Sequence, residues 1–113
     1  MNEFKSLRKN WEFQAVYRNG KSKANRCFVM IIKKNDASSN RIGISVSKKV
    51  GNSVVRHHLT RLIREAYRLN SNMFNSSLDI VVIARNTAKD KTYKEVESAL
   101  LHLAKLHNIL DEN

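Results

Sequence analysis

Proline is absent from the 113 residues, cysteine occurs once and glycine three times. Because Cys27 has no partner within the chain, an internal disulfide is excluded, and we expect the reducing cytoplasm as the compartment. Cys27 precedes Phe28 and Val29 in an apolar run, which favours a buried thiol over a nucleophile. Glycines this sparse exclude a phosphate-binding glycine loop, and Gly51 is better explained as a turn residue.

Long apolar runs are also missing. The first ten residues, MNEFKSLRKN, lack the apolar stretch of a signal peptide, and neither end reads as a membrane-binding amphipathic segment. We therefore expect no membrane partner. The chain has no low-complexity tract and no internal repeat, and its length with 42% hydrophobic residues suits one domain over residues 1–113.

Acidic residues are scarce in the first part of the chain only. Residues 1–68 contain 16 Lys or Arg against 4 Asp or Glu, whereas residues 69–113 contain 5 against 6. The formal net charge is +11. An excess of one sign in one part of the chain predicts a charged face and a polyanionic partner, with nucleic acid ahead of an anionic membrane.

The cations are concentrated between Arg41 and Arg68, where seven Lys or Arg accompany a single acid, Glu65. The pattern predicts a strand at 41–48, a basic pair (Lys48, Lys49), a turn at Gly51 and Asn52, and a helix over about 53–69. On a helical wheel, one arc of about 100° is apolar and comprises Val55, Leu59, Leu62, Ile63 and Ala66. The adjoining arc of about 140° comprises Arg56, His57, Thr60, Arg61, Arg64 and Arg68. Such a face fits either a solvated surface or an RNA-binding one, and the uneven charge favours the second.

The remaining elements complete an α+β prediction. Asn10 is expected to cap a helix that ends near Arg18 with Gly20 as its stop, and residues 21–34 predict a short strand followed by a longer one. The turn at 35–40 predicts a hairpin between 27–34 and 41–48. Residues 78–84 predict a strand buried on both faces, and residues 92–109 a final helix. The expected fold is a single-domain αβββαβα sandwich in which helices pack on a mixed four-stranded sheet.

Several residues and elements also allow interpretations other than simple RNA binding. His57 and His58 are neighbours about 100° apart on a helix and have no acid or cysteine at ligand spacing, which disfavours both a metal site and a paired-histidine nuclease. Phe13, Tyr17 and Phe28 either stack on unpaired bases or pack in the core. A duplex-reading helix-turn-helix is disfavoured because a strand precedes the basic helix.

The segment SKKVGNSVVRHHLTRLIRE at 47–65 is similar to the motif SKKxGNAVxRNRxKRxxRE of the bacterial ribonuclease P protein subunit. Two further segments, NWEFQAVYRNGKSKANRCFV and DIVVIAR, extend the resemblance from about residue 5 to 109. Three positions depart from the motif: His57 replaces Asn, His58 replaces Arg and Thr60 replaces Lys. The last two changes remove fixed cations, because threonine carries no charge and an imidazole is mostly neutral at pH 7.

The resemblance implies a fold and a division of labour. The fold would be ribosomal protein S5 domain 2-like, with a left-handed crossover between the central strand, the motif helix and the last strand. A catalytic RNA would cleave precursor tRNA at the 5′ end of the mature tRNA, with Mg²⁺ belonging to the assembled ribonucleoprotein and to no dedicated protein site. The protein would carry no catalytic residues and would be a monomer when free.

The resemblance also implies which residues touch RNA. The contacts to the catalytic RNA would be Lys48, Lys49, Asn52, Arg56, His57, His58, Thr60, Arg61, Arg64 and Arg68. The single-stranded 5′ leader of precursor tRNA would lie in a cleft between helix and sheet, lined by Phe13, Tyr17, Phe28, Ile31 and Ser45. Relatives often have Tyr at position 31, so Ile31 would lose stacking there. The alternatives are a structural RNA-binding protein, for instance of the ribosome, and a protein-only nuclease.

Overall fold

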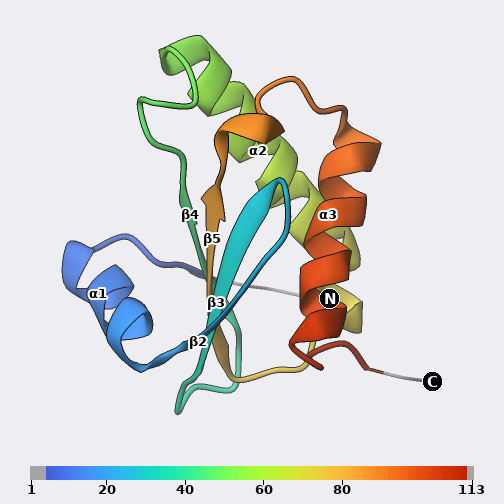
Figure 1. The fold of residues 1–113 in the computed structure, drawn as a ribbon. Coiled ribbons are helices and arrows are strands. Elements are labelled where there is room, and N and C mark those ends of the chain that lie inside the picture. The colour runs from blue at the N-terminus through green and yellow to red at the C-terminus, as the bar shows by residue number, and fades with distance from the viewer. Residues whose placement is uncertain (1–4, 112–113) are drawn as a thin grey trace.

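The sheet has five strands in the order β1-β4-β5-β3-β2, of which Figure 1 labels β2 to β5. The computed structural model describes residues 5–111. Its strands are β1 (Lys5–Ser6), β2 (Lys21–Ala24), β3 (Phe28–Lys34), β4 (Arg41–Ser45) and β5 (Leu78–Ala84). Its helices are α1 (Asn10–Asn19), α2 (Ser53–Asn70) and α3 (Tyr93–Leu106), with short 3-10 turns at Ser71–Met73 and Asn86–Ala88. The predicted α+β class with a mixed sheet is confirmed, and β1 is a strand that the sequence did not predict.

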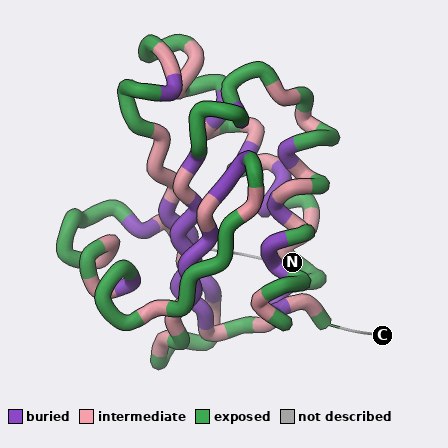
Figure 2. Tube along the Cα trace, in the orientation of Figure 1, coloured by how far each residue is buried: buried purple, intermediate pink, exposed green. Residues whose placement is uncertain are grey.

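Two apolar clusters lie on opposite faces of the sheet, because strand side chains alternate between the faces. The larger cluster packs the sheet against α2 and α3; it includes Phe28, Ile42, Leu59, Ile63 and Leu100. The smaller one packs α1 against Leu7, Ile31 and Val81. The sheet is thus a central layer between α1 and the α2–α3 pair (Figure 1), and the buried residues follow its strands (Figure 2).

The predicted hairpin between residues 27–34 and 41–48 is wrong, because β5 lies between β3 and β4. β3 pairs antiparallel with β5, and β4 pairs parallel with β5. β5 is buried at every position except the half-buried Ile83, so the central place shields both of its faces. The antiparallel hairpin that does form joins β2 to β3. The parallel crossover from β4 through α2 to β5 is present, and its left hand stays a prediction.

Local signals placed the helix ends with small errors. Lys9, rather than Asn10, is the N-cap of α1, and the Glu12 carboxylate accepts hydrogen bonds from the backbone N–H groups of Arg8 and Lys9 at 3.0 and 2.9 Å. Gly20 ends α1 as predicted, and its N–H donates to the carbonyl of Val16. For α3, Thr92 is the cap and the Thr92–Glu95 pair forms a capping box.

Candidate nucleic-acid interface

The basic helix α2 begins with a side-chain cap. The Asn52 Oδ1 accepts a hydrogen bond from the Val55 N–H at 3.0 Å. Asn52 is a predicted RNA contact, and in the folded protein its side-chain oxygen caps α2. Lys48 and Lys49 are exposed in the turn before it, while Val50 is buried and holds that turn on the core. The turn therefore presents two ammonium groups beside the first residues of α2.

The outer side of α2 displays the predicted histidines and two arginines. His57, His58, Arg61 and Arg64 are exposed. Arg64 donates to the Ser6 hydroxyl of β1 at 3.0 Å, and Arg61 makes no side-chain hydrogen bond or ion pair within residues 5–111. Shallow hollows lie between these side chains, lined by His58 and Arg61 in both cases. This side of α2 can accept phosphate oxygens without breaking internal ion pairs.

The other predicted members of this surface are partly engaged within the protein. Arg68 makes a two-pronged pair with Glu65, with both hydrogen bonds at 2.8 Å, so its charge is largely compensated. The Arg68 guanidinium in turn lowers the pKa of Glu65. The Thr60 hydroxyl donates to the Arg56 carbonyl at 2.8 Å. Arg56 is half-buried, and its buried Nε has no hydrogen-bond partner among the described residues.

Arg41, the first cation of the basic segment, belongs to an internal clamp. It donates to Glu12 of α1 at 3.0 Å and to both oxygens of Asp79 of β5 at 2.8 and 2.6 Å. Asn35 also donates to Asp79 at 2.8 Å. Burial works against ionisation of Asp79, but the hydrogen bonds from Arg41 and Asn35 outweigh it and lower the pKa of that carboxyl. We call Arg41, Glu12 and Asp79 the α1 clamp; it fixes α1 to the sheet.

The α1 face of the sheet carries four of the five predicted leader residues. Phe13 lies over Gly43, where a Cβ atom would come within 2.7 Å of its ring, so the glycine allows this close packing. Tyr17 is 38% exposed, and its ring centroid is 6.4 Å from that of Phe13. Ile31 lies on this face too, but it is buried beneath α1. Ser45 is half-buried at the end of β4.

A row across three strands adds two residues that the sequence did not single out. Ser45 pairs with Ile83, and Ile83 pairs with Val29, so these three side chains point to one face. All three are half-buried, whereas Gly43, Val81 and Ile31 in the next row are buried. We call Ser45, Ile83 and Val29 the open row. The alternation of β3 is the sequence signal that could have identified Val29.

The assignment of Phe28 to the leader surface is wrong. Phe28 has no exposed area and belongs to the core cluster on the α2–α3 face. It neighbours Val29 in the strand, and adjacent residues in a strand point to opposite faces. Its aromatic ring therefore contributes to stability rather than to stacking on a base.

Metal ligands do not gather in the part of the chain that the structure describes. Within residues 5–111, no three side chains of His, Cys, Asp or Glu are placed as a metal site requires. Within these residues the side chains therefore offer no clustered ligand set for a metal ion. Across the same residues, no helix has the length and apolar character needed to span a bilayer.

Comparison with known proteins identifies the family. The family model for ribonuclease P matches residues 1–107. The ribonuclease P protein component of Lachnoclostridium phytofermentans is 59% identical over 108 residues, which cover 96% of this chain and 93% of that protein.

Solved structures agree. The RNase P protein of Staphylococcus aureus superposes with a TM-score of 0.87 at 39% identity, covering 94% of this chain and 97% of that one. The protein from Thermotoga maritima gives 0.83 at 33% identity, covering 90% and 96%. The chain therefore belongs to the ribonuclease P protein family, whose members are the protein component of a tRNA-processing ribonucleoprotein endonuclease and work with its RNA.

Proposed function

We propose that this chain binds the RNA subunit through α2 and the basic turn, and binds the 5′ leader of precursor tRNA on the α1 face of the sheet. The observation that carries the proposal is the side of α2 on which Arg61 and the two histidines are exposed, with the Lys48–Lys49 turn beside it. Arg61, Lys48 and Lys49 supply the positive charge of this surface, from α2 and from the turn before it. Such a surface binds phosphates regardless of sequence.

The leader would lie on the α1 face beside the open row. Single-stranded RNA is held by aromatic stacking and by a groove that follows its phosphates, without a base code. Tyr17 supplies an exposed ring, and the open row supplies half-buried sheet surface on the α1 face. The α1 clamp sets how far α1 stands from these strands. The proposed leader site therefore depends on the position of α1.

The proposed chemical role is electrostatic. Cations brought beside the substrate reduce repulsion between the phosphates of the two RNAs, which lowers the ionic strength that the assembled enzyme needs. Hydrolysis and its Mg²⁺ are assigned to the RNA in this proposal, in keeping with the family to which the chain belongs. We also propose a cytoplasmic location and a monomeric free protein.

Reconstitution tests the proposal. Precursor tRNA and Mg²⁺ are incubated with the protein alone, with the RNA subunit alone at low salt, and with both. We expect efficient cleavage only in the mixture. A mixture that is no better than RNA alone would favour the structural RNA-binding alternative, and cleavage by protein alone would favour the protein-only nuclease.

A further inference from the structure

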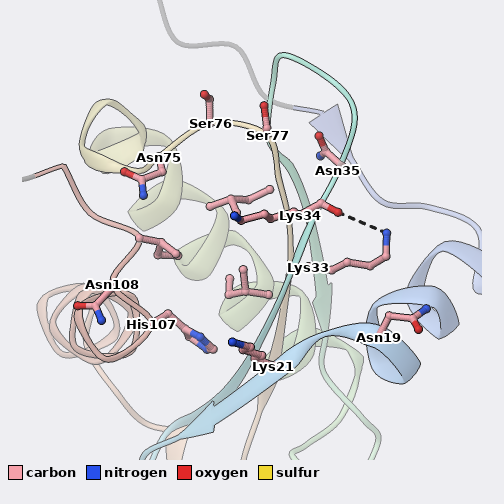
Figure 3. A pocket seen from close by; sticks show the side chains of 13 residues that line it. Asn19, Lys21, Lys33, Lys34, Asn35, Asn75, Ser76, Ser77, His107 and Asn108 are labelled. Atoms are coloured by element: carbon pink, nitrogen blue, oxygen red, sulfur yellow. Dashed lines mark hydrogen bonds between the residues drawn. The ribbon is translucent and has the colours of Figure 1, made fainter.

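A basic hollow lies at the end of the molecule opposite to the first turns of α2. It is open to solvent, has a volume of about 650 Å³, and is formed where α3 ends beside the edge strand β2 and the loop before β5. Figure 3 shows the lysines, asparagines and His107 around it. In Figure 1 this is the lower end of the molecule, whereas α2 begins at the upper end. We call this site the α3-end hollow.

The strand register places its cations on one face. Lys21 pairs with Ile32, and Lys34 pairs with Leu78, so both lysines share the face that α3 covers. Lys23 lies on the same face, two residues after Lys21 in β2 and about 7 Å from it along the strand. The hollow therefore continues into a strip of positive charge along the edge strand.

Within residues 5–111, no acid forms an ion pair with these lysines. The thirteen residues that line the hollow include no Asp or Glu, and Lys21 and Lys34 make no ion pair within residues 5–111. The nearby Asp79 points to the other face and is held in the α1 clamp. The side chains of Asn75 and Asn108 also line the hollow, and neither makes a hydrogen bond within the described residues. The hollow thus offers ammonium and amide donors to an anion.

His107 shapes the wall and adds no charge. Its Nε2–H donates to the Met30 carbonyl at 2.9 Å, which fixes the ring against β3. Burial, more than any other cause, lowers the pKa of His107, so the ring is neutral at pH 7. The attraction for an anion therefore comes from the lysines.

We propose that the α3-end hollow and the adjoining Lys23 bind phosphates of an RNA backbone, as a second RNA contact separate from α2. A backbone fits better than an isolated phosphate ion, because Lys21 and Lys23 are spaced along a strand and can meet successive phosphates. This inference rests on the proposed function. The alternative role for lysines on an edge strand is to prevent pairing with the edge of another sheet. In that role, replacing them would not change RNA binding.

The test compares two double variants of equal charge change. Lys21→Gln with Lys34→Gln removes the cations of the hollow, and Lys89→Gln with Lys94→Gln removes two exposed lysines elsewhere. Affinity for the RNA subunit is measured against salt concentration. We expect the first pair to weaken binding about tenfold and to flatten the salt slope by about 1.5, since each lost phosphate contact contributes about 0.7–0.9. The control pair should change the affinity less than twofold.

Further arms separate the sources of phosphate and the possible failures. If the first pair leaves affinity for the RNA subunit unchanged but weakens binding of precursor tRNA to the assembled enzyme, the RNA in the hollow is the substrate. Inorganic phosphate that competes for the hollow as well as RNA does would overturn a backbone site. Equal effects of both pairs would show a general charge effect and overturn the inference, as would no effect of either.

Arg61→Ala is measured alongside. If it weakens binding and the hollow variant does not, only this inference fails; if neither does, the proposed function fails too. Melting curves establish that each variant is folded.

Discussion

Individual cations on α2 differ in how freely they can meet RNA. Arg61 has no internal partner within residues 5–111, whereas Arg68 is held by both oxygens of Glu65. A phosphate that binds Arg68 must compete with this pair, while one that binds Arg61 need not. The two arginines, which a helical wheel treats as equivalent, are therefore not equivalent in the folded protein.

Arg61→Ala should weaken binding of the RNA subunit about tenfold, equal to roughly 1.4 kcal/mol. Arg68→Ala is the matched control and should cost much less, because it removes a charge that Glu65 already compensates. Filter binding at one fixed salt concentration measures both, and melting temperatures should stay within about 2 °C because surface substitutions change stability little. Equal losses from the two substitutions would contradict the distinction.

Position 58 tests the missing cation directly. His58 is exposed on α2 beside Arg61, where the family motif has arginine. Arginine carries a fixed charge and can make two parallel bonds to a phosphate, whereas a neutral imidazole cannot. His58→Arg should lower the dissociation constant for the RNA subunit several-fold at pH 7. An unchanged dissociation constant would place position 58 outside the interface.

At the scale of elements, the position of α1 depends on polar contacts as well as on apolar packing. The α1 clamp joins α1, β4 and β5, and Asp79 in it is only 3% exposed. Carboxylates with lowered pKa values stabilise a fold above their unfolded pKa and lose that effect as pH falls through the folded pKa. The hydrogen bonds from Lys9 and Arg8 are the main causes that lower the pKa of Glu12.

The clamp therefore predicts acid sensitivity. Stability from Asp79 and Glu12 should be complete above their ordinary values of 3.8 and 4.5 and should decrease as the pH falls below them. Asp79→Asn should cost about 2 kcal/mol at pH 7, less than a fully buried pair, because the Arg41 side chain is 29% exposed. The melting temperature of the Asp79→Asn variant should also change less between pH 5 and pH 3 than that of the parent protein. A variant as acid-sensitive as the parent would show that other groups control acid unfolding.

Gly43→Ala tests the contact between α1 and β4. The added Cβ would lie 2.7 Å from two ring atoms of Phe13 and 3.1 Å from Leu7, so Phe13 must move. We expect a loss of about 1–3 kcal/mol in stability from overpacking. Affinity for precursor tRNA relative to mature tRNA should fall, while affinity for the RNA subunit through α2 stays constant. Unchanged preference for the precursor would show that the leader does not depend on Phe13.

At the scale of the whole molecule, positive charge occurs on more than one surface. The exposed cations of α2, the basic turn and the α3-end hollow lie on different elements, and the late part of the chain is nearly neutral. If about six phosphates are neutralised in total, the logarithm of RNA affinity should fall with the logarithm of salt with a slope near −4 to −5. A titration from low to moderate salt measures this slope, and a flat response would contradict a phosphate-dominated interface.

The sequence by itself determined what periodicity and spacing encode. The 3.6-residue pattern located α2 and assigned Leu59, Ile63 and Ala66 to its buried face. The continuous apolar run predicted β5 at 78–84, as found. The motif at 47–65 pointed to the family that the comparisons confirm. These signals are local, because each depends only on residues within a few turns or strand lengths.

Only the tertiary structure decided which elements meet. Strand order depends on contacts between distant residues, so the sequence suggested that β3 and β4 pair, and β5 lies between them. Phe28 and Val29 are adjacent and both apolar, so the sequence does not show which face of the sheet each one joins. The placement of the helices shows that Phe28 faces α2 and α3 and that Val29 faces α1. The roles of Arg41 and Arg68 likewise depend on where carboxylates lie in space. Charge can be counted along a chain, but its availability is set by partners that the fold brings together.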